Sequence, residues 1–315
     1  MKGLSFLVPT LDKLTGGIMP GTVCTIVGAT GSMKTTYASN IAFNAVMEGK
    51  NVLFLSLEES PMQLFSKWLS RTSSDMGKPI PCNDIVRKEW EEKDEQILLN
   101  DVIPYFENLS GNLYIVGEQD LPSYQLTSLE SKFKEVDKLA QSESGHGIDL
   151  LVVDHIQLLK FAQNGLEEHT VINMYMSFFR QQSLSWLHDK REISVMVLSQ
   201  ANREGVAYAQ RHDGMYLSQH LAEASEVERA SSYIVSVYTD PMIQITKQLK
   251  VGAVKLRNAQ LPADSIVVSA EGEFYQVGDI AIPEQMDYST DSIMGSTPSS
   301  EISIDDLIDE NMFNF

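Results

Sequence analysis

Short apolar runs alternate along the chain with longer segments of helical periodicity. Five β-prone runs come before residue 201, at residues 23–27, 51–57, 113–116, 148–153 and 193–198. Apolar runs without polar alternation are typical of strands that helices cover on both faces of a parallel sheet. We therefore expect an α/β fold in which helices flank a doubly wound, mainly parallel sheet.

Helical segments stand between these runs. Apolar residues recur at helical spacing over residues 38–46, and Gly49 provides a stop. Further helices are predicted around residues 126–139 and 171–190. After Tyr233 the pattern changes to β-prone pieces separated by turn residues, at residues 233–238, 244–249, 252–256, 265–270 and 273–277. We expect these pieces to be antiparallel strands added at one edge of the sheet.

The last part of the chain loses hydrophobic periodicity. From about residue 283 it is rich in Ser, Asp, Thr and Met, and it contains acidic residues but no Lys or Arg. We expect a core over residues 1–282 and an acidic, disordered tail over residues 283–315. Apolar side chains interrupt the acids near the end, at Leu307, Ile308, Met312, Phe313 and Phe315. Two interpretations stay open, a solubilising end or a peptide ligand for a partner protein.

The composition excludes several classes of protein. Of 315 residues, 43 are acidic and 24 are basic, and the net charge of -19 excludes a generally basic nucleic-acid coat but not a local basic channel. Cys24 and Cys82 are too few for a disulfide framework and form no zinc motif. No apolar run approaches the roughly 18 residues of a membrane span. We expect a cytoplasmic protein with no membrane partner.

A near-complete phosphate-binding loop follows the first predicted strand. Residues 28–35 read Gly-Ala-Thr-Gly-Ser-Met-Lys-Thr, against the pattern Gly-x4-Gly-Lys-Ser/Thr. In such loops backbone N–H groups at a helix N-terminus bind phosphate oxygens, Lys34 adds a positive charge, and the Thr35 hydroxyl ligates Mg²⁺. The candidate ATP-binding residues are Gly28, Ala29, Thr30, Gly31, Ser32, Met33, Lys34, Thr35 and Thr36.

One position departs from the loop pattern. Met33 stands where the pattern has glycine, so a degenerate loop stays open as an alternative. Gly31 remains to relax the turn, and the loop lies between a predicted strand and a predicted helix, as the pattern requires.

Polar residues follow three other predicted strands. They are Asp154, Glu58 or Glu59, and Gln200. Ligands of doubly wound sheets bind beyond the carboxyl ends of the strands, so these side chains should gather around the same phosphates. Asp154 is the candidate magnesium ligand beside Thr35. One of the two glutamates could deprotonate a water, and the Gln200 amide could sense the γ-phosphate.

These motifs resemble the RecA-type ATPase core and, within it, the DnaB-like replicative helicases. The similarity covers roughly residues 8–280, a length of one to two typical domains. It rests on LDKLTGGIMPGTVCTIVGA, VLFLSLEESPMQL, IDLLVVDHIQLL, ISVMVLSQANRE, a weakened segment AEASEVERA, and VKLRNA. The resemblance implies a RecA-like fold, ATP hydrolysis with Mg²⁺, and self-assembly into a ring, expected to be a hexamer, on single-stranded DNA.

The resemblance also implies roles for single residues. Glu58 rather than Glu59 would be the catalytic base, with Asp154 as the magnesium acid and Gln200 as the sensor. His155 stands where an aromatic residue is common, and we interpret it as a packing residue and not a ligand.

A pair of cations completes the implied site. Lys255 and Arg257, in the segment VKLRNA, would reach the nucleotide of the neighbouring subunit and stabilise charge on the phosphoryl group. Their i, i+2 spacing puts both on one face of a strand.

The chain departs from the family pattern in three ways. Met33 replaces the loop glycine, Ala259 stands where glycine is usual, and we expect the N-terminal domain by which cellular replicative helicases engage primase to be absent. This architecture implies a phage-encoded replication protein located in the host cytoplasm. The tail resembles the acidic, phenylalanine-ended tails of single-stranded-DNA-binding proteins and some phage replication proteins, which implies a replication protein as its partner.

A Gly-bearing segment over residues 203–220 is the candidate DNA contact. Arg203, Arg211 and His212 could bind phosphates, while Tyr208 and Tyr216 could stack on bases. A flexible loop with solvated charges is the alternative, and both stay open.

Three functions are compatible with the sequence. The first is an ATP-dependent ring helicase that translocates on single-stranded DNA and unwinds forked duplex during replication. The second is a RecA-type strand-exchange recombinase, which would need a polymerisation segment before the loop, where only 27 residues precede Gly28. The third is a nucleotide-binding helicase loader or scaffold whose hydrolysis is impaired by Met33.

Overall fold

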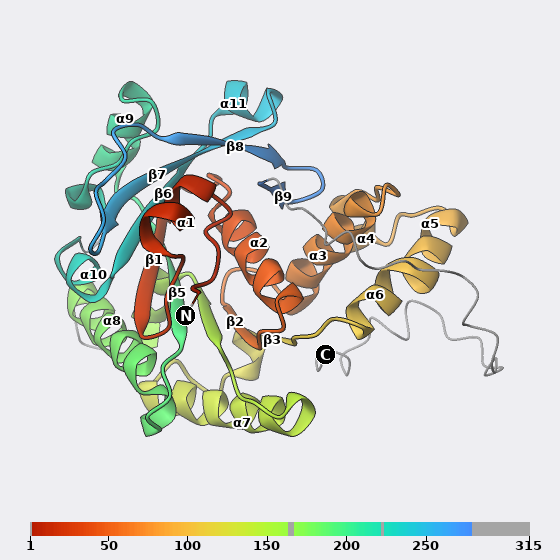
Figure 1. The fold of residues 1–315 in the computed structure, drawn as a ribbon, viewed down its shortest axis with the longest axis horizontal. Coiled ribbons are helices and arrows are strands. Elements are labelled where there is room, and N and C mark those ends of the chain that lie inside the picture. Colours follow the sequence, from red (N-terminus) through yellow and green to blue (C-terminus); the bar gives the residue numbers. More distant parts are fainter. Residues whose placement is uncertain (1, 163–166, 222–223, 279–315) are drawn as a thin grey trace.

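One twisted sheet runs through the whole molecule (Figure 1). The computed structural model describes residues 2–162, 167–221 and 224–278. Within these ranges the strand order is β3-β2-β4-β5-β1-β6-β7-β8-β9. The strands are β1 Thr22–Gly28, β2 Val52–Ser56, β3 Leu113–Gly117, β4 Leu150–Asp154, β5 Ser194–Gln200, β6 Tyr233–Tyr238, β7 Gln248–Leu256, β8 Ile266–Glu271 and β9 Gln276–Val277.

The strands in the order β3-β2-β4-β5-β1-β6 are parallel to one another. Alternate residues of each strand enter two separate cores, because side chains of a strand point in turn to opposite faces. In β2, Phe54 packs in one core, and Leu53 and Leu55 pack in the other. The doubly wound α/β prediction is confirmed.

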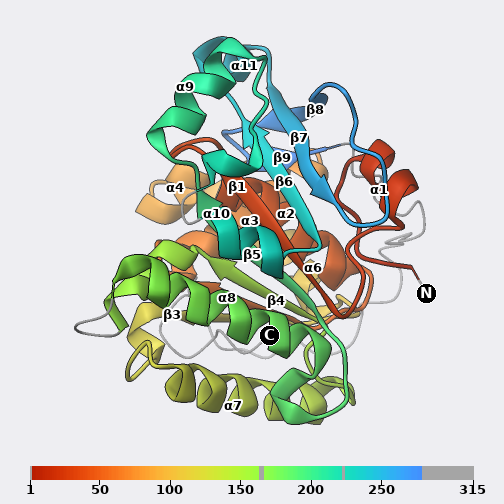
Figure 2. The same ribbon diagram turned by 90° about the vertical axis from the view of Figure 1, so that its left-hand side faces the viewer.

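Helices cover both faces of the sheet. On one face lie α1 to α6, and Phe43 and Trp68 pack edge to face there with ring centroids 4.9 Å apart. On the other face lie α7, α8 and α10, of which α7 and α8 occupy the lower part of the molecule in Figure 2. The helices are α1 Pro9–Thr15, α2 Lys34–Met47, α3 Pro61–Asp75, α4 Cys82–Arg87, α5 Glu92–Ile97, α6 Ile103–Glu107, α7 Leu126–Ser144, α8 Glu168–Leu184, α9 Arg203–Arg211, α10 Ala224–Ala230 and α11 Pro241–Ile245.

The antiparallel edge differs in part from the prediction. Strands β7, β8 and β9 are antiparallel as expected, but β6 lies parallel to β1 and so extends the parallel part of the sheet. Residues 244–249 were expected to be a strand, yet they contain the end of α11 and the start of β7. The helix begins there because Pro241 occupies its first turn and the Asp240 carboxylate accepts the N–H groups of Met242 and Ile243.

The predicted acidic tail, residues 283–315, lies outside the described residues. Among the described helices, we find none with the length and apolar character needed to cross a membrane.

Candidate nucleotide-binding site

The phosphate-binding loop joins β1 to α2 at the carboxyl edge of the sheet. Gly28 ends β1 where a Cβ would collide with the Ser32 hydroxyl and the Val237 carbonyl oxygen, so a glycine is needed there. Gly31 takes a left-handed φ of 74°. Met33 also lies in the left-handed region, with φ 67° and ψ 24°, directly before the first residue of α2. The loop therefore forms with methionine in a conformation that glycine adopts more easily.

Lys34 and Thr35 open α2 and point into the site. The Lys34 ammonium donates to the carbonyl oxygen of Ala29 at 2.7 Å. Burial lowers the pKa of Lys34, and the carboxylates of Asp154 and Glu58 partly oppose this shift. The Thr35 hydroxyl donates to Asp154 Oδ2 at 2.7 Å, so the two predicted magnesium ligands lie together.

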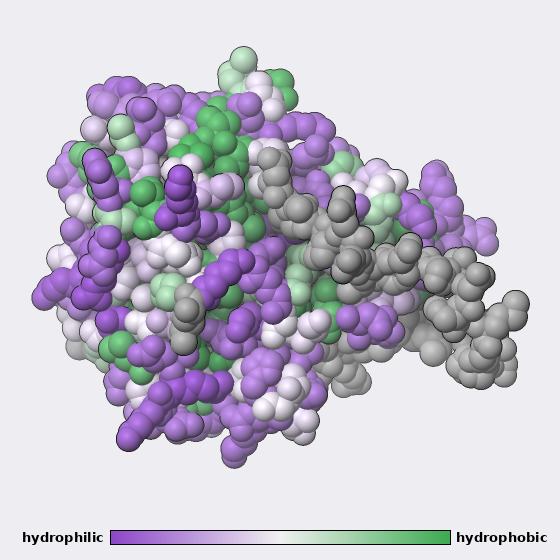
Figure 3. Space-filling view, in the orientation of Figure 1, coloured by the Kyte–Doolittle hydropathy of each residue, from purple (hydrophilic) through white to green (hydrophobic). Residues whose placement is uncertain are grey.

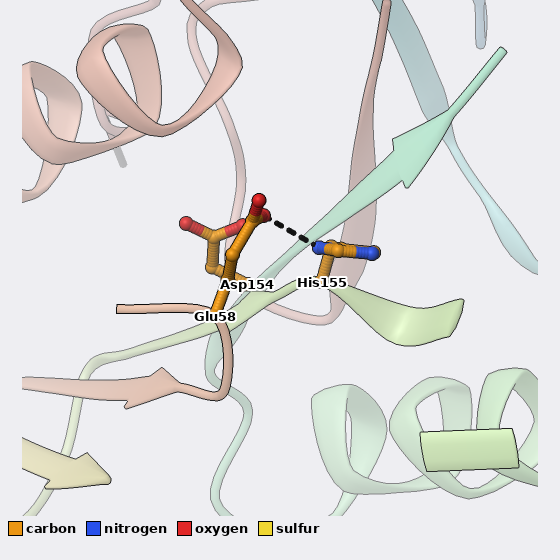
Figure 4. Close-up of side chains that lie close together, drawn as sticks. All are labelled: Glu58, Asp154 and His155. Atoms are coloured by element: carbon orange, nitrogen blue, oxygen red, sulfur yellow. Dashed lines mark hydrogen bonds and ion pairs between the residues drawn. The ribbon is translucent and has the colours of Figure 1, made fainter. Parts of the chain in front are cut away.

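Asp154 ends β4 as a buried carboxyl group, 2% exposed. Burial raises its pKa to about 6, although the hydrogen bond from Thr35 acts in the opposite direction. Ligand atoms of Glu58, Asp154 and His155 all lie within 4.8 Å of one another, and Figure 4 shows the three side chains converging from two strand ends. The Asp154 and Glu58 carboxylates and the Thr35 hydroxyl offer oxygen ligands, which suit a hard cation such as Mg²⁺.

The two adjacent glutamates have different partners. Glu59 forms an ion pair with Lys67 at 2.5 Å, whereas the Glu58 carboxylate lies 2.9 Å from His155 Nδ1 (Figure 4). Glu59 is thus neutralised by a buried lysine, and Glu58 remains the carboxylate that faces the Asp154 side of the site. The geometry favours Glu58 as the base.

His155 is buried, as expected for a packing residue, and it also contacts two polar side chains of the site, which the sequence did not predict. Its ring is buried, but Nδ1 is bonded to Glu58 and Nε2 lies 3.1 Å from the Gln200 amide nitrogen. The sequence signal was its place directly after the acid at a strand end, where side chains reach the ligand edge of the sheet.

Several of these side chains, though not Asp154 or His155, line a cavity of about 580 Å³. It is lined by Thr30, Gly31, Met33, Lys34, Thr35, Thr36, Glu58, Glu59, Lys67, Gln200, Gln244, Ile245, Lys247, Ala270, Glu271, Gly272, Glu273 and Tyr275. The buried Ser32 hydroxyl has no hydrogen-bond partner among the described residues and remains available to a ligand. Together with the loop N–H groups and Lys34, this hydroxyl fits a polyphosphate.

Lys67 and Tyr275 were not predicted from the sequence. The Lys67 ammonium lies 4.7 Å from the centre of the Tyr275 ring, and both line the cavity. No local pattern points to Tyr275, because it enters the site through the antiparallel pairing of β8 with β9.

Comparison with known proteins decides the family. The family model of the DnaB-like helicase C-terminal domain matches residues 3–276. The chain belongs to this family.

The sequence relatives of this DnaB-like domain are longer proteins. The replicative DNA helicase DnaB of Pasteurella multocida is 28% identical over 298 residues, which cover 92% of this chain and 57% of that protein. The replicative DNA helicase DnaB of Haemophilus influenzae is 26% identical over 290 residues, with 89% and 56% covered. The DnaB-like domain thus spans little more than half the length of these curated relatives.

Two solved structures share the fold of the DnaB-like domain. One is described as a DnaB-like replicative helicase and its interactions with primase, with a TM-score of 0.70, 18% identity, and coverage of 89% of this chain and 62% of that chain. The other is described as an ATPase domain, with a TM-score of 0.69, 18% identity, and coverage of 89% of this chain and 92% of that chain. The expected RecA-like fold is confirmed.

Lys255 and Arg257 of the DnaB-like domain lie far from its own loop. Leu256 pairs with Tyr233, which pairs with Cys24, four residues before Gly28. Four residues of strand span about 13 Å. Leu256 is buried, while Lys255 is partly exposed and Arg257 exposed, so the two cations share the face opposite Leu256. They cannot meet a phosphate bound at the loop of the same chain.

The candidate DNA segment is helical over residues 203–211, so the alternative of a flexible loop was wrong there. Asn202 caps α9 by accepting the Gly205 N–H at 2.7 Å. Arg203, Arg211 and His212 are exposed on this helix and its end, and the Tyr208 ring stacks on His212 with centroids 3.7 Å apart. Tyr216 is 2% exposed and so cannot stack on a base.

Proposed function

We propose that this chain is the ATPase motor of a DnaB-like replicative DNA helicase. In this proposal it assembles into a hexameric ring, hydrolyses ATP with Mg²⁺, translocates on single-stranded DNA and unwinds forked duplex. The observation that carries the proposal is the arrangement of the polar groups. The loop, Thr35 with Asp154, Glu58 and Gln200 converge at one edge of the sheet, whereas Lys255 and Arg257 lie toward the opposite edge.

Each side chain has a task that its position allows. The loop N–H groups and Lys34 bind the phosphates of ATP, and Thr35 and Asp154 would hold Mg²⁺. When bound, Mg²⁺ neutralises negative charge on the phosphoryl oxygens. Glu58, half exposed and facing the cavity, orients the attacking water and takes its proton.

The position of the cations supports a composite site. Because Lys255 and Arg257 cannot reach their own loop, they act on the nucleotide of the next subunit and stabilise charge on the transferring phosphoryl group. The rim of the cavity also favours contact with a neighbour. Met242 and Ile245 of α11 are 70% and 75% exposed, and Ile245 lines the cavity. Figure 3 shows apolar surface at the top of the molecule, where α11 lies in Figure 1.

The tail is part of the proposal. Residues 283–315 bind a replication protein, with terminal aromatic residues entering a pocket and acidic residues meeting basic side chains. Deletion of residues 301–315 is expected to preserve ATP hydrolysis and to weaken the binding of such a partner.

Steady-state ATP hydrolysis with and without single-stranded DNA tests the proposal. The wild-type chain should hydrolyse ATP with Mg²⁺ and respond to DNA, and Lys34→Ala should be inactive. ATP binding without hydrolysis, even with DNA present, would favour the loader or scaffold. Hydrolysis coupled to strand exchange instead of strand separation would favour the recombinase.

A further inference from the structure

His155 occupies the space between the candidate base and the candidate sensor. Its ring joins the ends of two strands, with Glu58 following β2 on one side and Gln200 ending β5 on the other. We propose that His155 is a positioning residue that couples Gln200 to Glu58, so that a movement of Gln200 changes the orientation of the base. This inference rests on the proposed ATPase function and adds to it a means of regulating hydrolysis.

The two contacts define one arrangement of protons. A carboxylate only accepts hydrogen bonds, so the 2.9 Å contact with Glu58 Oε2 requires the proton on His155 Nδ1. The Gln200 amide nitrogen only donates, so the 3.1 Å contact requires a free electron pair on His155 Nε2. A single neutral tautomer satisfies both partners. If Gln200 withdraws its N–H group or turns its carbonyl oxygen to the ring, that tautomer loses a partner.

The ring is the fixed member of this chain of contacts. His155 is 4% exposed, whereas the side chain of Glu58 is 49% exposed. Two residues further on, Gln157 donates to the Ser199 hydroxyl at 3.0 Å and accepts the Gln200 N–H at 3.2 Å. The end of β5 is therefore attached to the segment that carries the ring, and Glu58 is the group with room to reorient.

Gln200 connects this chain of contacts to α9. Only Ala201 and Asn202 separate it from the first residue of the helix, and Asn202 caps that helix. Asn202 N–H also donates to the His220 carbonyl oxygen at 2.9 Å, which fixes the junction. A shift of α9, on which the DNA-binding candidates lie, is passed through Gln200 and His155 to the base. DNA binding would thereby change the rate of hydrolysis.

Two substitutions at position 155 distinguish the contact with Glu58 from the contact with Gln200. His155→Phe keeps the ring volume and removes both hydrogen bonds. His155→Asn places an amide where Nδ1 lies, so it keeps a donor for Glu58 but is too short to reach Gln200. His188→Phe is the matched control, because His188 is exposed and bonded to Glu130 away from the cavity.

The readouts are kcat and KM for ATP, with and without single-stranded DNA, together with the thermal unfolding midpoint. His155→Phe is expected to lower kcat by about 10- to 100-fold, as is typical for groups that orient a catalytic ligand, and to change KM by less than about twofold. His155→Asn is expected to recover most of the DNA-independent kcat but not the stimulation by DNA. Gln200→Leu added to His155→Phe should cause no further loss of stimulation.

Three results would overturn the coupling. They are a His155→Phe chain with wild-type kcat, an equal loss of kcat in His155→Asn and His155→Phe, and DNA stimulation that survives in His155→Asn. If His155→Phe does not fold, His155→Asn alone decides. A wild-type chain that hydrolyses no ATP would overturn the proposed function, and the coupling with it. If the wild-type chain hydrolyses ATP and His155→Phe has the same kcat, only the coupling is overturned.

Discussion

Single residues set the chemistry of the site, and Met33 shows how local strain is tolerated there. A left-handed conformation costs a non-glycine residue roughly 1–2 kcal/mol. The Met33 side chain packs against the core beneath the loop, which offsets part of this cost. The sequence pattern alone could not show this, because the mismatch says nothing about the backbone that methionine adopts.

Met33→Gly tests whether the mismatch impairs the loop. The substitution relieves the backbone strain, which stabilises the folded chain. It also loses the packing of the Met33 side chain and adds conformational freedom to the unfolded chain, and both of these destabilise the fold. We expect the free energy of unfolding to change by less than about 1 kcal/mol and ATP hydrolysis to persist in both proteins. Chemical denaturation and an ATPase assay measure these quantities. A large gain of ATPase activity in Met33→Gly would show instead that the natural loop is impaired.

Asp154 makes stability depend on pH. Its unfolded pKa is the ordinary 3.8, and burial raises the folded value to about 6. The folded chain therefore binds the Asp154 proton more tightly than the unfolded chain does. The contribution of this proton to the free energy of unfolding is fully present below about pH 4 and is lost as the pH rises through about 6. In the metal-free protein at pH 8, Asp154→Asn should raise the free energy of unfolding by about 2–3 kcal/mol.

Urea unfolding in a metal chelator at pH 4 and pH 8 measures this difference. Asp154→Asn should have a higher free energy of unfolding than wild type at pH 8 and the same value at pH 4. The control Asp189→Asn, at an exposed aspartate, should match wild type at both pH values. Equal differences between Asp154→Asn and wild type at both pH values would contradict burial as the cause.

At the scale of elements, the periodicity of apolar residues predicted the parallel strands well and the short helices poorly. The central strands are buried on both faces, so their apolar runs stand out, and the ends of β2, β4 and β5 nominated Glu58, Asp154 and Gln200. Helices α9 and α11 were missed because each is a few turns at most and begins at a cap, Asn202 or Asp240, rather than at an apolar repeat. The bridge through His155 joins strands distant in sequence, and no local pattern encodes it.

Helix α9 carries a prediction about DNA. Replacing Arg203 and Arg211 together by alanine should weaken the binding of single-stranded DNA and reduce the slope of log affinity against log salt by about 0.7 for each lost phosphate contact. Fluorescence anisotropy at several salt concentrations measures the slope. Lys132→Ala with Lys134→Ala on α7 is the charge-matched control. An unchanged slope in the α9 variant would place the DNA contact elsewhere.

At the scale of the whole molecule, the sheet separates the two halves of the proposed site. The loop, Asp154 and Glu58 lie at the carboxyl edge, and Lys255 and Arg257 lie toward the other. Under the proposed function, a chain built in this way needs a second copy to complete its active site, and hydrolysis would be coupled to the arrangement of subunits. The family-model match and the shared fold agree with the DnaB-like family that the sequence motifs resemble.

Mixing two inactive variants tests this composite site. Lys34→Ala and Arg257→Ala should each lack ATPase activity, one through its own loop and the other through its neighbour's site. Rings formed by co-expression contain interfaces with an intact loop from one variant and an intact Arg257 from the other. Random mixing makes up to about a quarter of the interfaces functional, so ATPase activity should return. No recovery from rings shown to contain both variants would contradict the composite site.

The most direct test of the central claim is strand separation of a forked DNA duplex by the wild-type chain with ATP and Mg²⁺. The account predicts separation by wild type, none by Lys34→Ala, and none when a non-hydrolysable ATP analogue replaces ATP. Hydrolysis of ATP without strand separation, or separation by Lys34→Ala, would contradict it.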